Sequence, residues 1–170
     1  MMDYFTFDGQ LSSNRQREGV YAKLLSESLV ESYMKHNVVL SSHVVAFVTF
    51  HMIFQDYKSE GLMHLVNLKS HTFDIEMDEM IKLTYSIIQH LHDLNKQEKL
   101  LLSDEPWENT EKLIEVGLSN LGIYHAVDIL KYTKDKNLVC KNIRLLYFYH
   151  NRMVNYGLEE LMGWEKAWIN

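Results

Sequence analysis

The sequence has little of what marks a turn-rich, disulfide-bonded or nucleic-acid-binding protein. It contains one proline and seven glycines in 170 residues, which favours long helices over an all-β fold with many tight turns. Its single cysteine, Cys140, has no partner for an internal disulfide, so a reducing, cytoplasmic compartment is expected. A net charge of -6 argues against general nucleic-acid binding, because phosphate contacts require a concentrated basic face.

Long hydrophobic runs and export signals are also missing. The longest apolar stretch, about residues 42–55, would span only ~21 Å as a helix, which is short of the ~30 Å core of a bilayer. Asp3 and Asp8 stand where an export signal would be basic and then apolar. We therefore expect a core helix and a cytoplasmic protein, with peripheral contact at the inner face of the cell membrane left open.

What the sequence does contain is material for a substantial core. Hydrophobic residues make up 46% of the chain and aromatic residues 12%, which excludes general disorder. We expect a single domain over residues 1–170, with a leading segment (1–13) and an amphipathic tail (158–170). The fold class is mainly α, in an α+β arrangement with a small antiparallel sheet or hairpin.

Apolar periodicity and capping residues define the expected elements. Tyr21, Leu25, Leu29 and Tyr33 recur every fourth residue, as on one face of a helix. Serines at 41 and 42, Pro106 and Asn142 are expected to begin three further helices, and Gly122 to end one. The predicted helices cover 14–36, 42–55, 77–94, 106–121 and 142–156; short strands cover 38–40, 99–103, 127–133 and 138–141; residues 62–68 are apolar but of undetermined type.

The acidic residues are densest between positions 104 and 115. Five carboxylates in this stretch face only one basic residue, Lys112. A solvated helix face explains the pattern, and a contact for a basic partner is the alternative.

One motif suggests catalysis. His51 and Asp56 form His-x4-Asp, the pattern in which a histidine base and an orienting aspartate activate a hydroxyl for acyl transfer. On a continuous helix, however, these two side chains would diverge by about 140°. No Gly- and Pro-rich basic segment follows to hold a phosphate. We therefore predict that His51 and Asp56 are not catalytic, and that the histidine belongs to the core.

No other cluster indicates an active site. The remaining histidines have no cysteine or carboxylate at metal-ligand spacing, and Cys140 has no assignable base, so we expect neither metal nor cofactor. Trp164 and Trp168 lie at helical spacing in the tail, where they would form a docking surface for a membrane or partner domain, or pack on their own domain.

The order of expected elements also suggests a binding module. Helices followed by a hairpin are typical of a winged-helix domain, with residues 77–99 as the candidate recognition helix. Lys82, Lys96 and Lys99 are outnumbered there by carboxylates, which is unfavourable for binding to phosphates.

Several segments of the chain carry a resemblance to a known family. They are GQL (9–11), QR (16–17), YAKLL (21–25), VESY (30–33), NVVLSSHVVAF (37–47), GL (117–118) through Leu121, YH (124–125) and LLYFYHNR (145–152). In this order they resemble the region that follows the catalytic domain of bacterial membrane-associated glycerol-3-phosphate acyltransferases. The resemblance implies a non-catalytic C-terminal portion of an enzyme of phospholipid biosynthesis, whose partner is a catalytic acyltransferase domain in the same or another chain.

Overall fold

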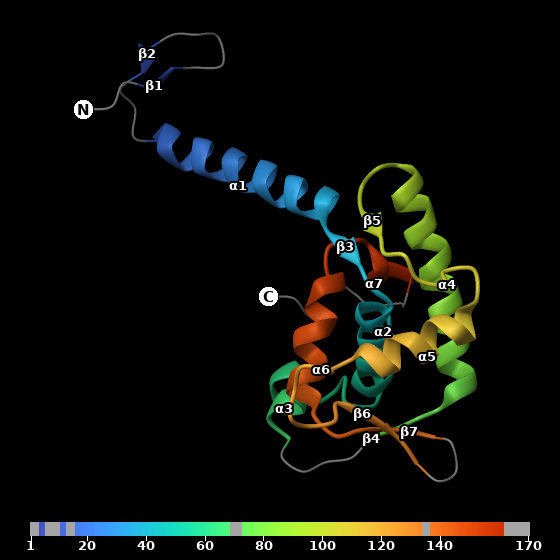
Figure 1. Cartoon of the computed structure of the whole chain (residues 1–170). Coiled ribbons are helices and arrows are strands. Elements are labelled where there is room, and N and C mark those ends of the chain that lie inside the picture. The colour runs from blue at the N-terminus through green and yellow to red at the C-terminus, as the bar shows by residue number, and fades with distance from the viewer. Residues whose placement is uncertain (1–3, 6–10, 13–15, 69–72, 134–136, 162–170) are drawn as a thin grey trace. The chain divides into compact units, whose positions relative to one another are not determined.

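The computed structural model describes residues 4–5, 11–12, 16–68, 73–133 and 137–161 (Figure 1). The protein is mainly helical with a small antiparallel sheet, which confirms the predicted α+β class. The chain divides into two compact units, Met1–Asn37 and Val38–Asn170. Within the described part of the chain, no helix has the length and apolar character needed to cross a membrane.

The first unit contains one long helix. Strands β1 (Tyr4–Phe5) and β2 (Leu11–Ser12) form an antiparallel pair, and helix α1 (Gln16–His36) follows. The predicted apolar stripe lies on α1. Tyr21 is half-buried and the other members are exposed: 62% of Leu25 and 61% of Leu29 are accessible to solvent.

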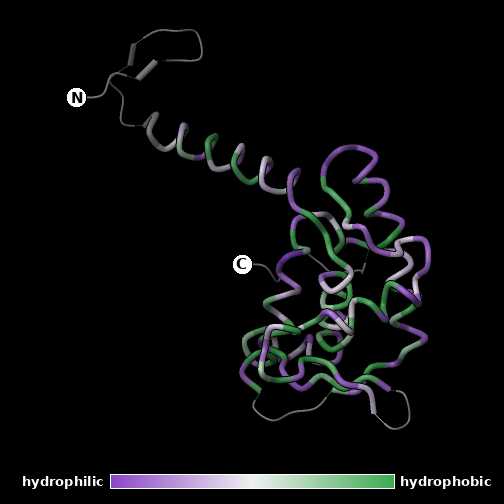
Figure 2. Tube along the Cα trace, viewed as in Figure 1, coloured by the Kyte–Doolittle hydropathy of each residue, from purple (hydrophilic) through white to green (hydrophobic). Residues whose placement is uncertain are grey.

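Helix α2 (Ser41–Asp56) forms the centre of the second unit, as predicted for the apolar stretch. It is buried along most of its length, as expected for a helix that is hydrophobic on nearly every side. Its main neighbours are α4 (Met77–Lys96), α5 (Thr110–Asn120) and α6 (Ile143–His150). The hydropathy trace shows this apolar centre among more polar outer segments (Figure 2).

A glycine permits the close approach of α5 to α2. A Cβ atom on Gly117 would lie 2.6 Å from Val45 Cγ2 and 2.7 Å from the Ser41 carbonyl oxygen. These separations are shorter than van der Waals contact, so no larger residue fits unless the helices move apart.

Side-chain caps begin two of the helices. Asn109 Oδ1 accepts the Lys112 amide at 2.9 Å and begins α5, and Asn142 Oδ1 accepts the Leu145 amide at 3.1 Å and begins α6. The expectation that Pro106 stands in the first turn of α5 was therefore wrong. It lies in the preceding turn, because the amide acceptor that starts the helix is Asn109.

The C-terminal end of α5 lies where it was predicted, and the C-terminal end of α6 does not. Gly122 lies just beyond α5 with φ 79°, the left-handed conformation that ends helices, as predicted. Helix α6 ends at His150 and continues only as the 3-10 turn Asn151–Met153, so the predicted extension to residue 156 was wrong. Val154 is extended and Asn155 has φ 78°, which breaks the helical path.

Two small sheets complete the second unit. Strands β3 (Val38–Val39) and β5 (Leu101–Leu102) pair in parallel. Strands β4 (Phe73–Ile75), β7 (Leu138–Cys140) and β6 (Leu130–Tyr132) form an antiparallel sheet with β7 in the middle. Strand β4 was not predicted, because three residues are too short to show an alternating pattern. Helix α3 (Leu62–Asn67) gives the apolar 62–68 segment its structure, and helix α7 (Leu158–Leu161) begins the tail.

The order of elements through the second unit is α2, α3, β4, α4, β5, α5 and the β6–β7 hairpin, and the antiparallel sheet has the strand order β4-β7-β6.

Candidate functional site

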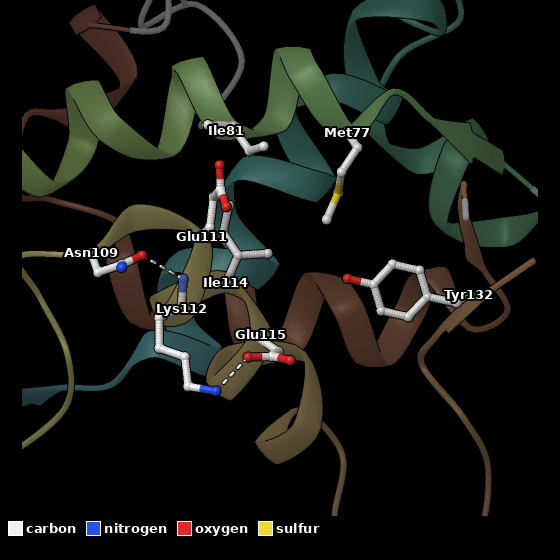
Figure 3. Close-up of a pocket in the computed structure, with 8 residues that line it drawn as sticks. All are labelled: Met77, Ile81, Asn109, Glu111, Lys112, Ile114, Glu115 and Tyr132. Carbon is white, nitrogen blue, oxygen red and sulfur yellow. Dashed lines mark hydrogen bonds and ion pairs between the residues drawn. The ribbon is translucent and has the colours of Figure 1, made fainter. Parts of the chain in front are cut away.

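The candidate site is a pocket of about 540 Å³ where α4, α5 and β6 meet (Figure 3). Its apolar side chains come from both helices, and the hydroxyl of Tyr132 points toward α5 from the hairpin. Two carboxylates and one ammonium group supply its formal charges. We call it the acidic groove; its lining residues are Met77, Ile81, Asn109, Glu111, Lys112, Ile114, Glu115 and Tyr132.

The start of α5 positions the polar side of the acidic groove. The Asn109 cap fixes the first turn, which presents Glu111 toward Ile81 of α4. One turn later Glu115 accepts a hydrogen bond from the Lys112 ammonium at 2.5 Å. Ile114 lies between these carboxylates at the floor of the pocket and is only 1% exposed, so the accessible apolar surface comes mainly from the half-buried Met77 and Ile81 of α4.

The electrostatics of the acidic groove affect its tyrosine. Burial raises the pKa of Tyr132, and the neighbouring Glu115 carboxylate raises it further because a phenolate there would be repelled. The same field favours a bound cation. The carboxylates and the hydroxyl of this lining suit a positively charged group that also carries apolar atoms. None of the lining residues is an activated nucleophile.

A second polar cluster lies at the N-terminus of α2, where it stabilises the start of that helix. Glu105 accepts the Ser41 amide at 2.7 Å, the Ser41 hydroxyl at 2.6 Å and the Ser103 hydroxyl. Burial alone would raise the pKa of Glu105, but these hydrogen bonds outweigh it and the pKa is lowered. The prediction that Ser41 or Ser42 caps α2 was wrong, because Leu40 is the N-cap. The Glu105 carboxylate, from a loop distant in the sequence, accepts the Ser41 amide in the first turn of the helix.

The same cluster contains His43, whose imidazole is neutral. Its Nδ1 accepts the Leu40 amide at 3.3 Å. Burial lowers the pKa of His43 to about 4, the positive charge of Arg152 lowers it further, and Glu105 opposes both.

The structure places His51 and Asp56 in different surroundings. His51 lies in the core, with 4% exposure, and its Nε2 accepts a hydrogen bond from the Gln55 amide at 3.3 Å. Asp56 is exposed at the last residue of α2. Burial lowers the pKa of His51 to about 4, with a further contribution from His150. The pair lacks the histidine–carboxylate hydrogen bond that would orient a base.

The other candidates from the sequence form no reactive site. His150 stacks on Phe47 with ring centroids 4.9 Å apart, as part of the aromatic core around α2 and α6. Cys140 is buried in β7, and burial raises the pKa of its thiol to about 12. Among the described residues, no three His, Cys, Asp or Glu side chains gather closely enough to hold a metal ion. Trp164 and Trp168 lie outside the described residues.

Sequence reasoning missed most of the acidic groove. Met77, Ile81 and Ile114 belong to periodic apolar faces, and periodicity does not distinguish a groove from the core. The one useful signal was the acidic stretch at 104–115, for which a basic partner had been the alternative interpretation. Comparisons with protein families, curated proteins and solved structures find no significant match to this chain.

Proposed function

We propose that this chain is a non-catalytic portion of a bacterial glycerol-3-phosphate acyltransferase, the part that supports or orients the catalytic domain. On this proposal, acyl transfer to glycerol 3-phosphate takes place on a catalytic domain in the same or another chain. The present chain supplies a helical accessory structure at the cytoplasmic side of the membrane.

The observation that supports the proposal is where the resembling segments lie in the fold. Three of them are far apart in sequence: residues 37–47, 117–121 and 145–152. They contribute to α2, α5 and α6, and α2 packs against both of the other helices. Two of the resembling residues carry specific packing roles, Gly117 at the α2–α5 approach and His150 in the aromatic stack on Phe47.

Resemblance confined to surface positions would carry less weight, because surface residues are weakly constrained by packing. Part of the resemblance falls on core positions, among them Val39, Val44, Val45, Ala46, Phe47, Gly117, Leu121, Leu146 and His150, whereas the resembling segments on α1 and Tyr124 are mostly exposed. This fits an accessory role, in which a defined shape matters more than reactive groups.

An immunoprecipitation experiment tests the proposal. An antibody raised against the second unit would be used on native extract, and the precipitate assayed for transfer of a labelled acyl group from a thioester to glycerol 3-phosphate. We expect a polypeptide much longer than 170 residues, or a co-precipitated second chain, together with acyl-transfer activity. A native product of 170 residues that brings down no such activity would contradict the proposal.

Assay of the isolated chain provides the matched control. The purified chain should transfer no acyl group, and His51→Ala should leave activity in the precipitate unchanged, apart from effects on folding. If the isolated chain is active and His51→Ala abolishes that activity, the chain is itself an enzyme and the accessory role is rejected.

A winged-helix-like binding or protein-interaction module is the second candidate. It is favoured by two helices, α4 and α5, that precede the β6–β7 hairpin, and by the strand order β4-β7-β6, although α3 and β5 interrupt the series. In such a module the helix before the hairpin, here α5, would be the recognition helix. It carries Glu111 and Glu115, which oppose a phosphate backbone. This argues for a protein rather than DNA as its ligand. Binding of duplex DNA at low salt that weakens steeply as salt rises would reverse that conclusion.

A further inference from the structure

The acidic groove combines an apolar floor with a negatively charged edge. Ile114 is buried, whereas Glu111 and Glu115 above it are exposed. Met77 and Ile81 close the opposite side from α4 (Figure 3). A ligand that fills this space must therefore bury apolar atoms and bring positive charge to its rim.

The surrounding charges add to the same field. Of the carboxylates in the 104–115 stretch, Glu105 is occupied by the α2 cap. Asp104, Glu108 and Glu111 are exposed, and within the described residues none of them forms an ion pair. The one basic residue of the stretch, Lys112, is held by Glu115. A cation arriving at the acidic groove thus meets an uncompensated negative potential.

We propose that the acidic groove binds a basic amphipathic segment of a protein partner. Apolar side chains of that segment, or the aliphatic stems of its lysines and arginines, lie on Met77 and Ile81 of α4, above the buried Ile114. Its ammonium or guanidinium groups meet Glu111 and Glu115, and the Tyr132 hydroxyl accepts a hydrogen bond from them. Nucleic acids and anionic lipid surfaces are disfavoured, because their phosphates would be repelled by the same carboxylates.

The position of the acidic groove suits this role. It lies between α4, α5 and strand β6 of the hairpin, so a bound segment contacts both helices and the sheet. The inference rests on the proposed function in one respect only: under that proposal, the bound segment belongs to the catalytic domain. The binding chemistry itself is independent of any acyl transfer.

Fluorescence anisotropy with a labelled amphipathic Leu/Lys peptide tests the inference on the full chain, and a Leu/Glu peptide of equal length serves as the probe of opposite charge. We expect the Leu/Lys peptide to bind, and its affinity to fall as salt screens the carboxylates. The double variant Glu111→Gln with Glu115→Gln should bind about tenfold more weakly, a loss of about 1.4 kcal/mol. Ile81→Ser should weaken binding as well, because it makes the α4 side of the groove polar.

A matched double variant separates the acidic groove from net charge. Asp56→Asn with Asp93→Asn removes the same two charges at exposed positions outside the groove, and it should bind the peptide as the wild type does. Circular dichroism would show that each variant keeps its helical content. No binding of the Leu/Lys peptide, equal binding of the Leu/Glu peptide, or equal weakening by both double variants would each overturn the inference. None of these measurements uses an acyl-transfer assay. A failure of this inference can therefore be distinguished from a failure of the proposed function.

Discussion

Substitution of Gly117 by alanine tests the packing of α5 against α2 most directly. The added Cβ would lie 2.6 Å from Val45 Cγ2, 2.7 Å from the Ser41 carbonyl oxygen and 2.9 Å from the Ser41 carbonyl carbon. The valine methyl can rotate away. The Ser41 carbonyl cannot, because it belongs to the first turn of α2, which Glu105 holds through the Ser41 amide and hydroxyl.

Two opposing effects set the magnitude. Overpacking of a core costs ~1–3 kcal/mol, and a clash with backbone belongs in the upper part of that range. Alanine is a better helix former than glycine by ~1 kcal/mol, which offsets part of the cost. The expected net loss in the free energy of unfolding is therefore about 1–2 kcal/mol.

Urea unfolding followed by circular dichroism measures this loss as a lower midpoint with an unchanged m-value. Gly19→Ala is the matched control, since Gly19 is also helical but a Cβ there meets nothing within 4 Å. That variant should keep or increase helical content. A Gly117→Ala midpoint at or above that of the wild type would refute the close approach of the two helices.

The half-buried Glu105 and the buried His150 and Cys140 allow three more tests. Glu105→Ala should lower the free energy of unfolding by about 1–2 kcal/mol through loss of the α2 cap, whereas Glu108→Ala, an exposed neighbour, should leave it nearly unchanged; equal effects in urea unfolding would contradict the capping role. Because the pKa of His150 is lowered from 6.5 to about 4, the unfolded chain binds the proton more readily, so stability should fall as pH decreases from 6.5 toward 4. Replacing it with phenylalanine should make the unfolding midpoint less dependent on pH in that window, and an unchanged dependence would argue against a buried neutral imidazole. Cys140 should resist a thiol reagent at pH 8 in the folded protein and react once urea unfolds it; rapid reaction in the native state would show that β7 is open.

Local sequence patterns predicted the principal helices and the hairpin because their causes are local. Asn142 could be recognised as a helix cap, and Gly122 as a helix end, since each acts on backbone within a few residues. The apolar 42–55 stretch predicted a core helix from hydrophobicity alone. Strand β4 was missed because its three residues gain their stability from pairing with β7, which is more than sixty positions away in the chain.

The candidate site could be predicted from the sequence much less well than the helices, because tertiary structure brings its residues together. The 104–115 stretch looked like one acidic surface, yet folding divides its carboxylates between two roles: Glu105 caps α2, while Glu111 and Glu115 line the acidic groove. No local pattern distinguishes these residues, because the distinction depends on what each meets across the fold.

The sequence by itself determined that this is a mainly helical protein with a buried apolar helix and no recognisable catalytic motif with its companions. Those properties follow from periodicity, capping chemistry and composition, which act over a few turns of chain. Tertiary structure alone decided that Glu105 caps α2, that Gly117 is a packing contact, and that α4, α5 and β6 enclose a groove. Each of these depends on distances between segments remote in sequence, which only the folded chain brings together.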